Sequence, residues 1–407
     1  MRQPLRVTKS NFKKTTLMKR IGILTYFTDI PYFNDINPGM NLQAYAVYSA
    51  LKAQYPKAHI EFIRYHSWWA EWRPYISGMT IGSLLQDFKQ LIKYHQFTKS
   101  FPKSHKALVS RDREKSLRFI DRLNYNAIYV GSDTLLELFR CNQNEVSAYW
   151  LNSDVKARKF MIAASARDTS FASLSSVQKV LLNDSVSSFD MLGVRDDATF
   201  DLVSRFISDD DDRLRIVPDP TFALEIDYSY AEKYLERKGL LKTRKPIVCF
   251  HLLKNSMFAQ ELADLYREKG YLVASLRPAK YADFLLKDLS PMEFAGIFKY
   301  FDVVLTHRFH DSVFCLKNLC PLLLFQPSEY YENDKGNSKQ SSLMEQFGLR
   351  QHCFMREVSS LTASDLFVLL EDAKKSFREK ENSVANKLSE LREQFKEYVS
   401  CTAIKVI

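Results

Sequence analysis

Short apolar runs alternate along the chain with longer segments of mixed polarity that suit helices. Turn residues follow each run, and continuous apolar runs of this length are typical of strands buried on both faces. Helices are predicted between them, including 41–54 and 196–206. This alternation predicts an α/β protein with parallel sheets covered by helices on both sides. The first six predicted strands are RIGILTY, HIEFIRY, NAIYVGSD, RKFMIAAS, FDMLGVRD and RLRIVPD.

A charged stretch, YAEKYLERKGLLKTRK, separates this series from a second one. The second series contains PIVCFHLL, YLVASLRP, DVVLT and PLLLF. Two series predict two Rossmann-like domains, 20–228 and 229–407, whose sheets face a cleft between the domains. Residues 66–120 interrupt the first series and are predicted to form an insertion over or beside the cleft, with Trp68, Trp69 and Trp72 as a rim or as packing residues. A charged helical tail, 373–400, is placed to cross back onto the first domain.

Charge is concentrated at one end of the chain. The net charge is +10, but residues 1–20 carry seven basic residues and no acid, which leaves only +3 for the remainder. We expect 1–19 to form a disordered basic leader; a membrane-surface tether and an upstream-start artefact are the alternatives. No apolar run is long enough to span a membrane, and the six cysteines form no CxxC pair. This composition favours a cytoplasmic protein with reduced thiols and no metal site, in contact at most with the inner face of the membrane.

The stretch THRFHDSVF, 306–314, carries the strongest candidate chemistry. The capping-box pattern that begins at Ser290 predicts a helix, DVVLT a strand and 312–319 the next helix. Arg308 and His310 would then lie in an extended turn at the carboxyl end of a parallel strand and project to one side, with His307 on the other. Ligands of open α/β sheets bind at such ends. The alternative is an arginine paired with a carboxylate beside a satisfied interior histidine.

Other polar residues follow comparable strands. Ser132 and Asp133 come after NAIYV, and Arg195 comes after FDMLGV. Asn41 is placed to cap the helix that follows NDINPG, and Gln43 to reach a ligand. Each also has a purely structural interpretation as a turn or a helix cap. The sequence lacks GxGxxG, GxxxxGK[ST], HExxH and GxSxG, so it does not indicate a dinucleotide dehydrogenase, a P-loop enzyme, a zincin or an α/β-hydrolase.

Taken in order, these segments resemble the polysaccharide pyruvyl transferase family. The resemblance rests on NPGMNLQAYAVYSAL, VGSD, MIAASA, GVRDDAT, VPDPTF, LSPMEFAGIFKYFDVVLTHRFHDSVFCL and SLMEQFGL. It implies a GT-B-like fold and transfer of a pyruvyl group from phosphoenolpyruvate, as the donor substrate and without a cofactor, onto two sugar hydroxyls to form a ketal. The sugar would belong to a cell-surface polysaccharide or its precursor, and its acceptor form, lipid-linked or polymeric, is left open.

The resemblance also implies roles for individual residues. By the resemblance, Arg195, Arg308, Phe309 and His310 fall where the family has functional residues, so all four would bind the donor and His310 and Arg308 would be catalytic. From the residues themselves we add Ser132 and Ser290 as donor-binding candidates. Candidates for binding the acceptor, on the side of the first domain, are Asn41, Gln43, Asp133 and Arg167. Phosphoenolpyruvate carries a carboxylate and a phosphate, each of which an arginine fork binds bidentately, and a histidine suits the proton transfers.

The chain departs from the family pattern at three places. Asp311 stands where many members have glycine, 134–136 replace a tryptophan-containing turn, and Ala166-Arg167 stand where some members have a histidine. Two other classes of function compete with a pyruvyl transferase. A GT-B glycosyltransferase that uses a nucleotide sugar would share the fold and the cleft, but the second domain shows no Glu-rich ribose motif. A non-catalytic protein that binds nucleic acid or a membrane surface would suit the basic leader, but only the leader is strongly basic, and basic and aromatic residues do not alternate elsewhere.

Overall fold

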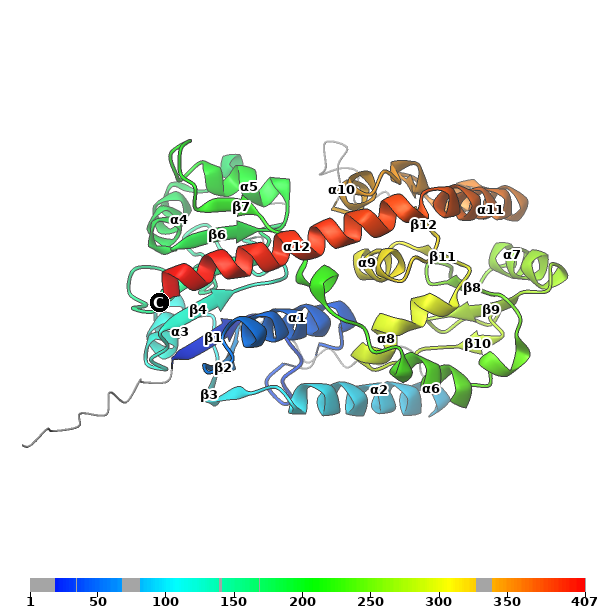
Figure 1. The fold of residues 1–407 in the computed structure, drawn as a ribbon, viewed down its shortest axis with the longest axis horizontal. Helices are drawn as coiled ribbons and strands as arrows, with labels where there is room; N and C mark the ends of the chain where they lie inside the picture. The colour runs from blue at the N-terminus through cyan, green and yellow to red at the C-terminus, as the bar shows by residue number, and fades with distance from the viewer. Residues whose placement is uncertain are drawn as a thin grey trace, which may run out of the picture.

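The computed structural model describes residues 19–33, 35–67, 81–138, 141–167, 169–326 and 339–406. It contains two parallel sheets side by side, which we call the first and the second lobe (Figure 1). The predicted leader up to residue 18 and the three tryptophans at 68, 69 and 72 lie outside the described residues.

The first lobe is built on a seven-stranded sheet in the order β3-β2-β1-β4-β5-β6-β7, and every pairing is parallel. The six apolar strands predicted for this lobe are all present. Helices cover both faces of the sheet and bury its central strands, whereas Arg215 and Ile216 of the last strand, at the edge, are exposed. The strands are β1 Arg20–Leu24, β2 His59–His66, β3 Lys103–Val109, β4 Ala127–Val130, β5 Arg158–Ala164, β6 Met191–Val194 and β7 Leu214–Ile216.

Strand β3 was not predicted. It lies within the segment interpreted as an insertion, yet it pairs with β2 and forms the edge of the sheet. Helices of this lobe begin with α1, which starts three residues before the predicted helix. The helices are α1 Pro38–Gln54, α2 Ile81–Lys99, α3 Arg113–Asp121, α4 Ser176–Ser188 and α5 Asp197–Ser204.

The second lobe has a six-stranded parallel sheet in the order β10-β9-β8-β11-β12-β13. Its strands are β8 Ile247–Phe250, β9 Leu272–Ser275, β10 Phe284–Leu285, β11 Val303–Thr306, β12 Leu322–Phe325 and β13 Cys353–Phe354. Its helices, with α6 leading into the lobe, are α6 Ser229–Arg237, α7 Met257–Glu268, α8 Pro291–Ile297, α9 Phe309–Lys317, α10 Lys339–Gln346 and α11 Ala363–Glu379. The predicted capping box of α8 is confirmed, with reciprocal hydrogen bonds between Ser290 and Glu293.

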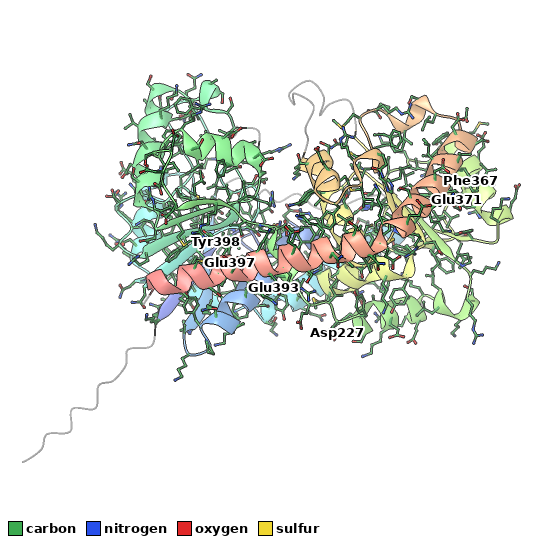
Figure 2. All side chains as sticks on the ribbon, turned by 45° about the horizontal axis from the view of Figure 1, so that its top comes forward. Asp227, Phe367, Glu371, Glu393, Glu397 and Tyr398 are labelled. Carbon is green, nitrogen blue, oxygen red and sulfur yellow. The ribbon has the colours of Figure 1, made fainter. Side chains whose placement is uncertain are left out.

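Helix α12, Glu381–Val406, returns from the second lobe across the first (Figures 1 and 2). Tyr398 on this helix donates a hydrogen bond of 2.5 Å to the carbonyl of Met161 in β5. Gly193 in β6 leaves room for the Tyr398 ring, since a Cβ there would lie 2.5 Å from its hydroxyl oxygen. The tail therefore crosses back as predicted, although a break near Lys380 separates α11 from α12.

Helix α2 forms a second connection between the lobes (Figure 1). Lys93 donates to the Glu293 carboxylate at 2.7 Å and to the Asp288 carbonyl at 2.6 Å, and Asp87 pairs with Lys287. These partly or fully buried contacts hold the lobes in the relative position that forms the cleft.

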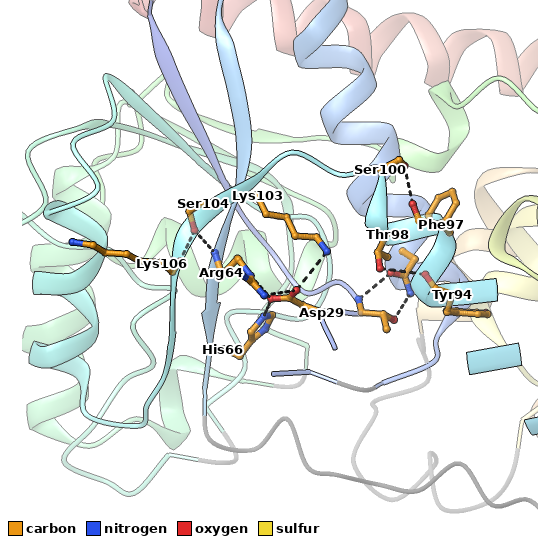
Figure 3. A network of polar contacts seen from close by, with 12 residues as sticks. Asp29, Arg64, His66, Tyr94, Phe97, Thr98, Ser100, Lys103, Ser104 and Lys106 are labelled. Carbon is orange, nitrogen blue, oxygen red and sulfur yellow. Dashed lines mark hydrogen bonds and ion pairs between the residues drawn. The ribbon is translucent and has the colours of Figure 1, made fainter. Parts of the chain in front are cut away.

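A buried carboxylate anchors the loop between β1 and α1. Asp29 accepts hydrogen bonds from Arg64 at 2.9 Å and 3.3 Å and lies 3.4 Å from His66 Nε2 and 3.5 Å from Lys103 Nζ (Figure 3). Burial would raise the pKa of Asp29, but the contacts with His66 and Arg64 outweigh it and lower the pKa to about 2. The loop is thereby fixed, and with it the start of α1 at Pro38.

Candidate functional site

A cleft of about 2290 Å³ lies between the carboxyl ends of the two sheets. Residues from both lobes line it, among them the candidates Asp133, Arg167, Arg195, Arg308, Phe309 and His310. The first turn of α1 reaches the same cleft through Pro38 and Met40. The N-terminal end of α1 therefore lies at this wall of the cleft, and the helix dipole gives it positive partial charge.

Four side chains from four segments meet around Asp219, which is 3% exposed. Gln43 Nε2 donates to Asp219 Oδ2 at 2.5 Å, and Arg195 Nη1 lies 3.4 Å from the same oxygen. Burial would raise the pKa of Asp219, but Arg195, His310 and the Thr221 hydroxyl hold it below its usual value. The carboxylate therefore stays charged and fixes the side chains around it.

Three polar atoms of this cluster are buried and have no partner within the described residues: Gln43 Oε1, Arg195 Nη2 and His310 Nε2. Buried polar atoms are rarely left without a partner, because each costs about 1–3 kcal/mol. Arg195 and His310 line the cleft, whereas Gln43 is fully buried and is absent from the described lining. A donor and a histidine nitrogen left open at the cleft are what a polar ligand would satisfy.

Phe309 lies close to two cations. The Arg195 guanidinium carbon is 5.5 Å from the centre of the ring, and Lys339 Nζ is 5.0 Å from it. The ring also contacts His310 edge-on, with centroids 5.5 Å apart. Phe309 therefore holds two positive side chains and the histidine beside one another at the cleft.

His310 sits in the first turn of α9 and packs against the first turn of α1. A Cβ on Gly39 would lie 2.0 Å from His310 Cγ, so only glycine leaves space for the ring. Burial lowers the pKa of His310 to about 4, although Asp219 and Asp133 oppose this effect. The ring is therefore neutral at pH 7 and is able to accept a proton.

The extended turn predicted for 307–311 was wrong. Helix α9 begins at Phe309, three residues before the predicted start, and Arg308 is its N-cap residue. The prediction that His307 points away from the site was also wrong, because His307 and Arg308 both line the cleft. Burial and the neighbouring Arg308 lower the pKa of His307 to about 4.

Two other candidates have structural contacts instead. Asn41 is fully buried and does not cap α1, since Asn37 is the N-cap residue; its side chain bonds to Thr28 and to the Asn37 carbonyl. The Ser290 hydroxyl accepts from Glu293 N as the cap of α8. Its neighbour Leu289 lines the cleft, whereas Ser290 is absent from the described lining.

Of the remaining first-lobe candidates, Asp133 and Arg167 line the cleft and Ser132 does not. Ser132 is fully buried, and its carbonyl accepts from the Thr25 hydroxyl at 2.9 Å. Asp133 and Arg167 line the cleft, and Arg167 Nη1 lies 3.7 Å from Glu137 Oε2. Both adopt a positive φ, 96° and 54° respectively, which turns the chain at the ends of β4 and β5.

Asp311, the departure from the family pattern, is explained by its contacts. It is buried, and its Oδ2 lies 2.5 Å from His251 Nδ1 and accepts from the Thr306 hydroxyl at 2.6 Å. Burial would raise the pKa of Asp311, but His251, Arg308 and the Thr306 hydroxyl together outweigh burial and lower the pKa. His251 lines the cleft at the end of β8 and was missed in the sequence; the signal available was its position after the apolar run PIVCF.

The architecture identifies the class of protein first. Two Rossmann-like lobes around a cleft form a GT-B-like fold, and solved structures share it at low sequence identity. Of three such structures, an α,α-trehalose-phosphate synthase from Burkholderia vietnamiensis has a TM-score of 0.52 and 12% identity, over 96% of this chain and 97% of its own. A putative UDP-N-acetylglucosamine 2-epimerase from Listeria monocytogenes has 0.50 and 9%, over 90% of each chain. A UDP-GlcNAc 2-epimerase from Methanocaldococcus jannaschii has 0.50 and 11%, over 87% and 92%.

The family is more specific than the fold. The model of the polysaccharide pyruvyl transferase family matches residues 37–328, so the chain belongs to that family and is a transferase. No curated protein sequence matches the chain. Within the described ranges, no three His, Cys, Asp or Glu side chains are grouped to hold a metal ion, and none of the helices there is long and apolar enough to cross a membrane.

Proposed function

We propose that the protein transfers the pyruvyl group of phosphoenolpyruvate onto two hydroxyls of a sugar in a cell-surface polysaccharide or its precursor, forming a cyclic ketal. The observation that carries the proposal is the pair of open polar atoms at the cleft beside Asp219, Arg195 Nη2 and His310 Nε2. A ligand with anionic oxygens would satisfy the arginine, and a sugar hydroxyl would satisfy the histidine.

Phosphoenolpyruvate presents anionic groups at both ends. Arg195 enters the cleft from the first lobe and Arg308 from the second, so each is available to one anionic group of the donor. We assign the carboxylate to Arg195, beside the Phe309 ring, and the phosphate to Arg308. The start of α1 adds favourable partial charge to the same cleft. This arrangement would hold the enol carbon between the lobes, within reach of a hydroxyl bound at His310.

His310 is proposed as the acid/base. Its neutral ring would take the proton of the first hydroxyl as the oxygen adds to C2 of phosphoenolpyruvate, and would pass it to the C3 methylene. Proton transfer by a positioned side chain typically contributes about 10²–10⁴-fold. We propose no cofactor, because the donor itself supplies the activated carbon and the leaving phosphate.

The proposal is tested by product analysis. We expect phosphate release when the protein is incubated with phosphoenolpyruvate and the correct member of a panel of para-nitrophenyl hexosides, together with a glycoside whose mass has increased by a ketal-bound pyruvyl group. A matched control, Asp209→Asn in an exposed loop, should behave as the wild type. Release of nucleoside diphosphate from nucleotide sugars in parallel incubations, with no reaction of phosphoenolpyruvate, would instead establish a glycosyltransferase.

We further propose that the enzyme works in the cytoplasm against an anionic membrane that carries a lipid-linked acceptor. Helix α2 supports this, because its cleft side includes Tyr94 while Leu84, Leu85, Phe88 and Ile92 are exposed on another side, Phe88 by 61%. Exposed Lys89 and Lys99 flank this apolar stripe. Apolar residues bordered by lysines are typical of helices that lie at a membrane surface.

Charge reversal on this stripe is expected to release the protein from vesicles. Leu85→Glu with Phe88→Glu should reduce co-sedimentation with vesicles of phosphatidylglycerol and phosphatidylethanolamine by about tenfold, since both apolar burial and charge attraction are lost. The matched control is Val180→Glu, at an equally exposed apolar position on α4. Equal sedimentation of the double variant and the wild type would rule out α2 as the contact.

A further inference from the structure

A second histidine of the cleft is held by a buried carboxylate. His251 is 6% exposed, and its Nδ1 lies 2.5 Å from Oδ2 of Asp311, which is 1% exposed. The contact engages Nδ1 and leaves Nε2 as the other ring nitrogen. A buried carboxylate on Nδ1 fixes the orientation and tautomer of an imidazole and stabilises the positive charge that the ring acquires when Nε2 binds a proton.

Hydrogen bonds fix the positions of both His251 and Asp311. The His251 backbone N–H donates to the Leu305 carbonyl at 2.9 Å, which extends the pairing of β8 with β11. The Thr306 hydroxyl accepts from Arg308 N at 3.1 Å and donates to Asp311 at 2.6 Å. A continuous chain of hydrogen bonds therefore connects the backbone of the donor-site arginine to the carboxylate that holds His251.

Charged groups of the cleft fall into two sets. His310 is influenced chiefly by Asp219, Asp133, Lys339 and Arg195. His307, beside His251, is influenced by Arg308, His251, Asp311 and Arg277. The second set lies at the ends of β9, β8 and β11, which are neighbours in the sheet. The two arginines of the second set, Arg308 and Arg277, suit the binding of a phosphate. His310 lies in the first set, away from that phosphate.

We propose that His251 is a second catalytic residue, which protonates the oxygen that leaves with phosphate, and that Asp311 is its positioning residue. The inference rests on the proposed pyruvyl transfer. That reaction removes two hydroxyl protons from the sugar and delivers them to different atoms: one to C3, which becomes a methyl group, and one to phosphate. Separate proton carriers on the two sides of the donor meet this requirement.

In the second step, phosphate leaves and the second sugar hydroxyl takes its place on C2. The bond between C2 and the phosphate oxygen breaks, its electron pair stays on that oxygen, and Nε2 of His251 supplies the proton. The second sugar hydroxyl forms its bond to C2 and gives its proton to His310. The ring of His310 ends protonated and that of His251 ends neutral, and a proton returned through solvent restores both before the next turnover.

The experiment separates addition from phosphate loss. His251→Gln and Asp311→Asn are assayed with phosphoenolpyruvate and the best para-nitrophenyl hexoside, quenched rapidly in base and analysed by mass spectrometry. We expect kcat to fall about tenfold to 10²-fold with KM for phosphoenolpyruvate within about threefold, and an adduct with the summed mass of the two substrates to accumulate. His310→Gln should form no adduct, because addition itself is blocked. His352→Gln, which removes a buried histidine outside the described cleft lining, is the matched control.

Each outcome decides the question. Unchanged kcat in His251→Gln overturns the inference, and so does a lower kcat without the adduct, which would leave His251 a structural role. His251→Gln decides alone if circular dichroism shows that Asp311→Asn is unfolded. Absence of phosphate release by the wild type would overturn the proposed function and this inference together, which distinguishes that failure from the failure of His251 alone.

Discussion

Replacing His310 by glutamine is expected to lower kcat about 10³-fold while KM for phosphoenolpyruvate stays within about threefold. Glutamine retains a hydrogen-bonding group near the position of Nε2, but it cannot accept and return a proton. The effect on kcat should be large because the neutral ring, with its pKa lowered to about 4 by burial, is the proposed base of the addition step. Steady-state phosphate release measures both constants.

The same variant has a second readout in stability. The His310 pKa is about 4 when folded and 6.5 as a free side chain. The unfolded chain therefore binds a proton first as pH falls, and stability decreases between pH 6.5 and about 4. His310→Gln should remove about 2–3 kcal/mol of this decrease, measured by urea unfolding at pH 7 and pH 4. Asp29 and Asp219, whose pKa values are lowered, contribute little in this window, because an unfolded aspartate binds a proton only near its usual pKa of 3.8.

A wild-type kcat in His310→Gln, with the stability change as expected, would show that the buried histidine is a structural residue of the lobe contact. The matched control is His352→Gln. Burial also lowers the pKa of His352 to about 4, so this variant should flatten the acid decrease in stability to a similar degree and leave turnover unchanged. Comparing His310→Gln with His352→Gln therefore distinguishes the effect of losing a buried histidine with a lowered pKa from the effect of losing the proposed base.

Much of the fold follows from local pattern. Strands such as β4 and β12 are apolar throughout because helices bury both of their faces, and an unbroken apolar run is visible in the sequence. Strand β3, KSHKALV, lies at the edge of its sheet and is largely exposed, so it has no such run and was missed. The two-residue strands β10 and β13 are too short to leave a pattern.

The candidate site was predictable only where strand ends mark it. Arg195 directly follows one apolar strand and Arg308 comes two residues after another, and the rule that ligands bind at the carboxyl ends of parallel strands was sufficient to choose them. The start of α9 was misplaced, because the polar residues from His307 to Asp311 resemble a loop. Asp311 is buried only because His251, 60 positions away, supplies its partner. No local pattern records a contact of that kind.

The contact between Gly39 and the His310 ring is the clearest one that the sequence could not reveal. Gly39→Ala is expected to lower kcat about 10²-fold. Alanine normally stabilises a helix relative to glycine by about 0.5–1 kcal/mol. Here its Cβ would lie 2.0 Å from His310 Cγ, which no packing tolerates, so the ring or the start of α1 must move. A displacement of about 1 Å from the productive geometry costs on the order of 10²-fold. Steady-state phosphate release and thermal unfolding measure the two effects.

A double-variant cycle shows whether Gly39 acts through His310. In the His310→Ala background the ring is absent and an alanine at 39 has room, so Gly39→Ala should cost no further activity. The control is Gly296→Ala in α8, where the added Cβ would be 3.1 Å from Ala231 Cβ, among residues that do not line the described cleft. Full activity of Gly39→Ala would mean that the lobes are farther apart during turnover. In that case the contact between α1 and α9 belongs to a resting geometry, and His310 acts without the support of the first lobe.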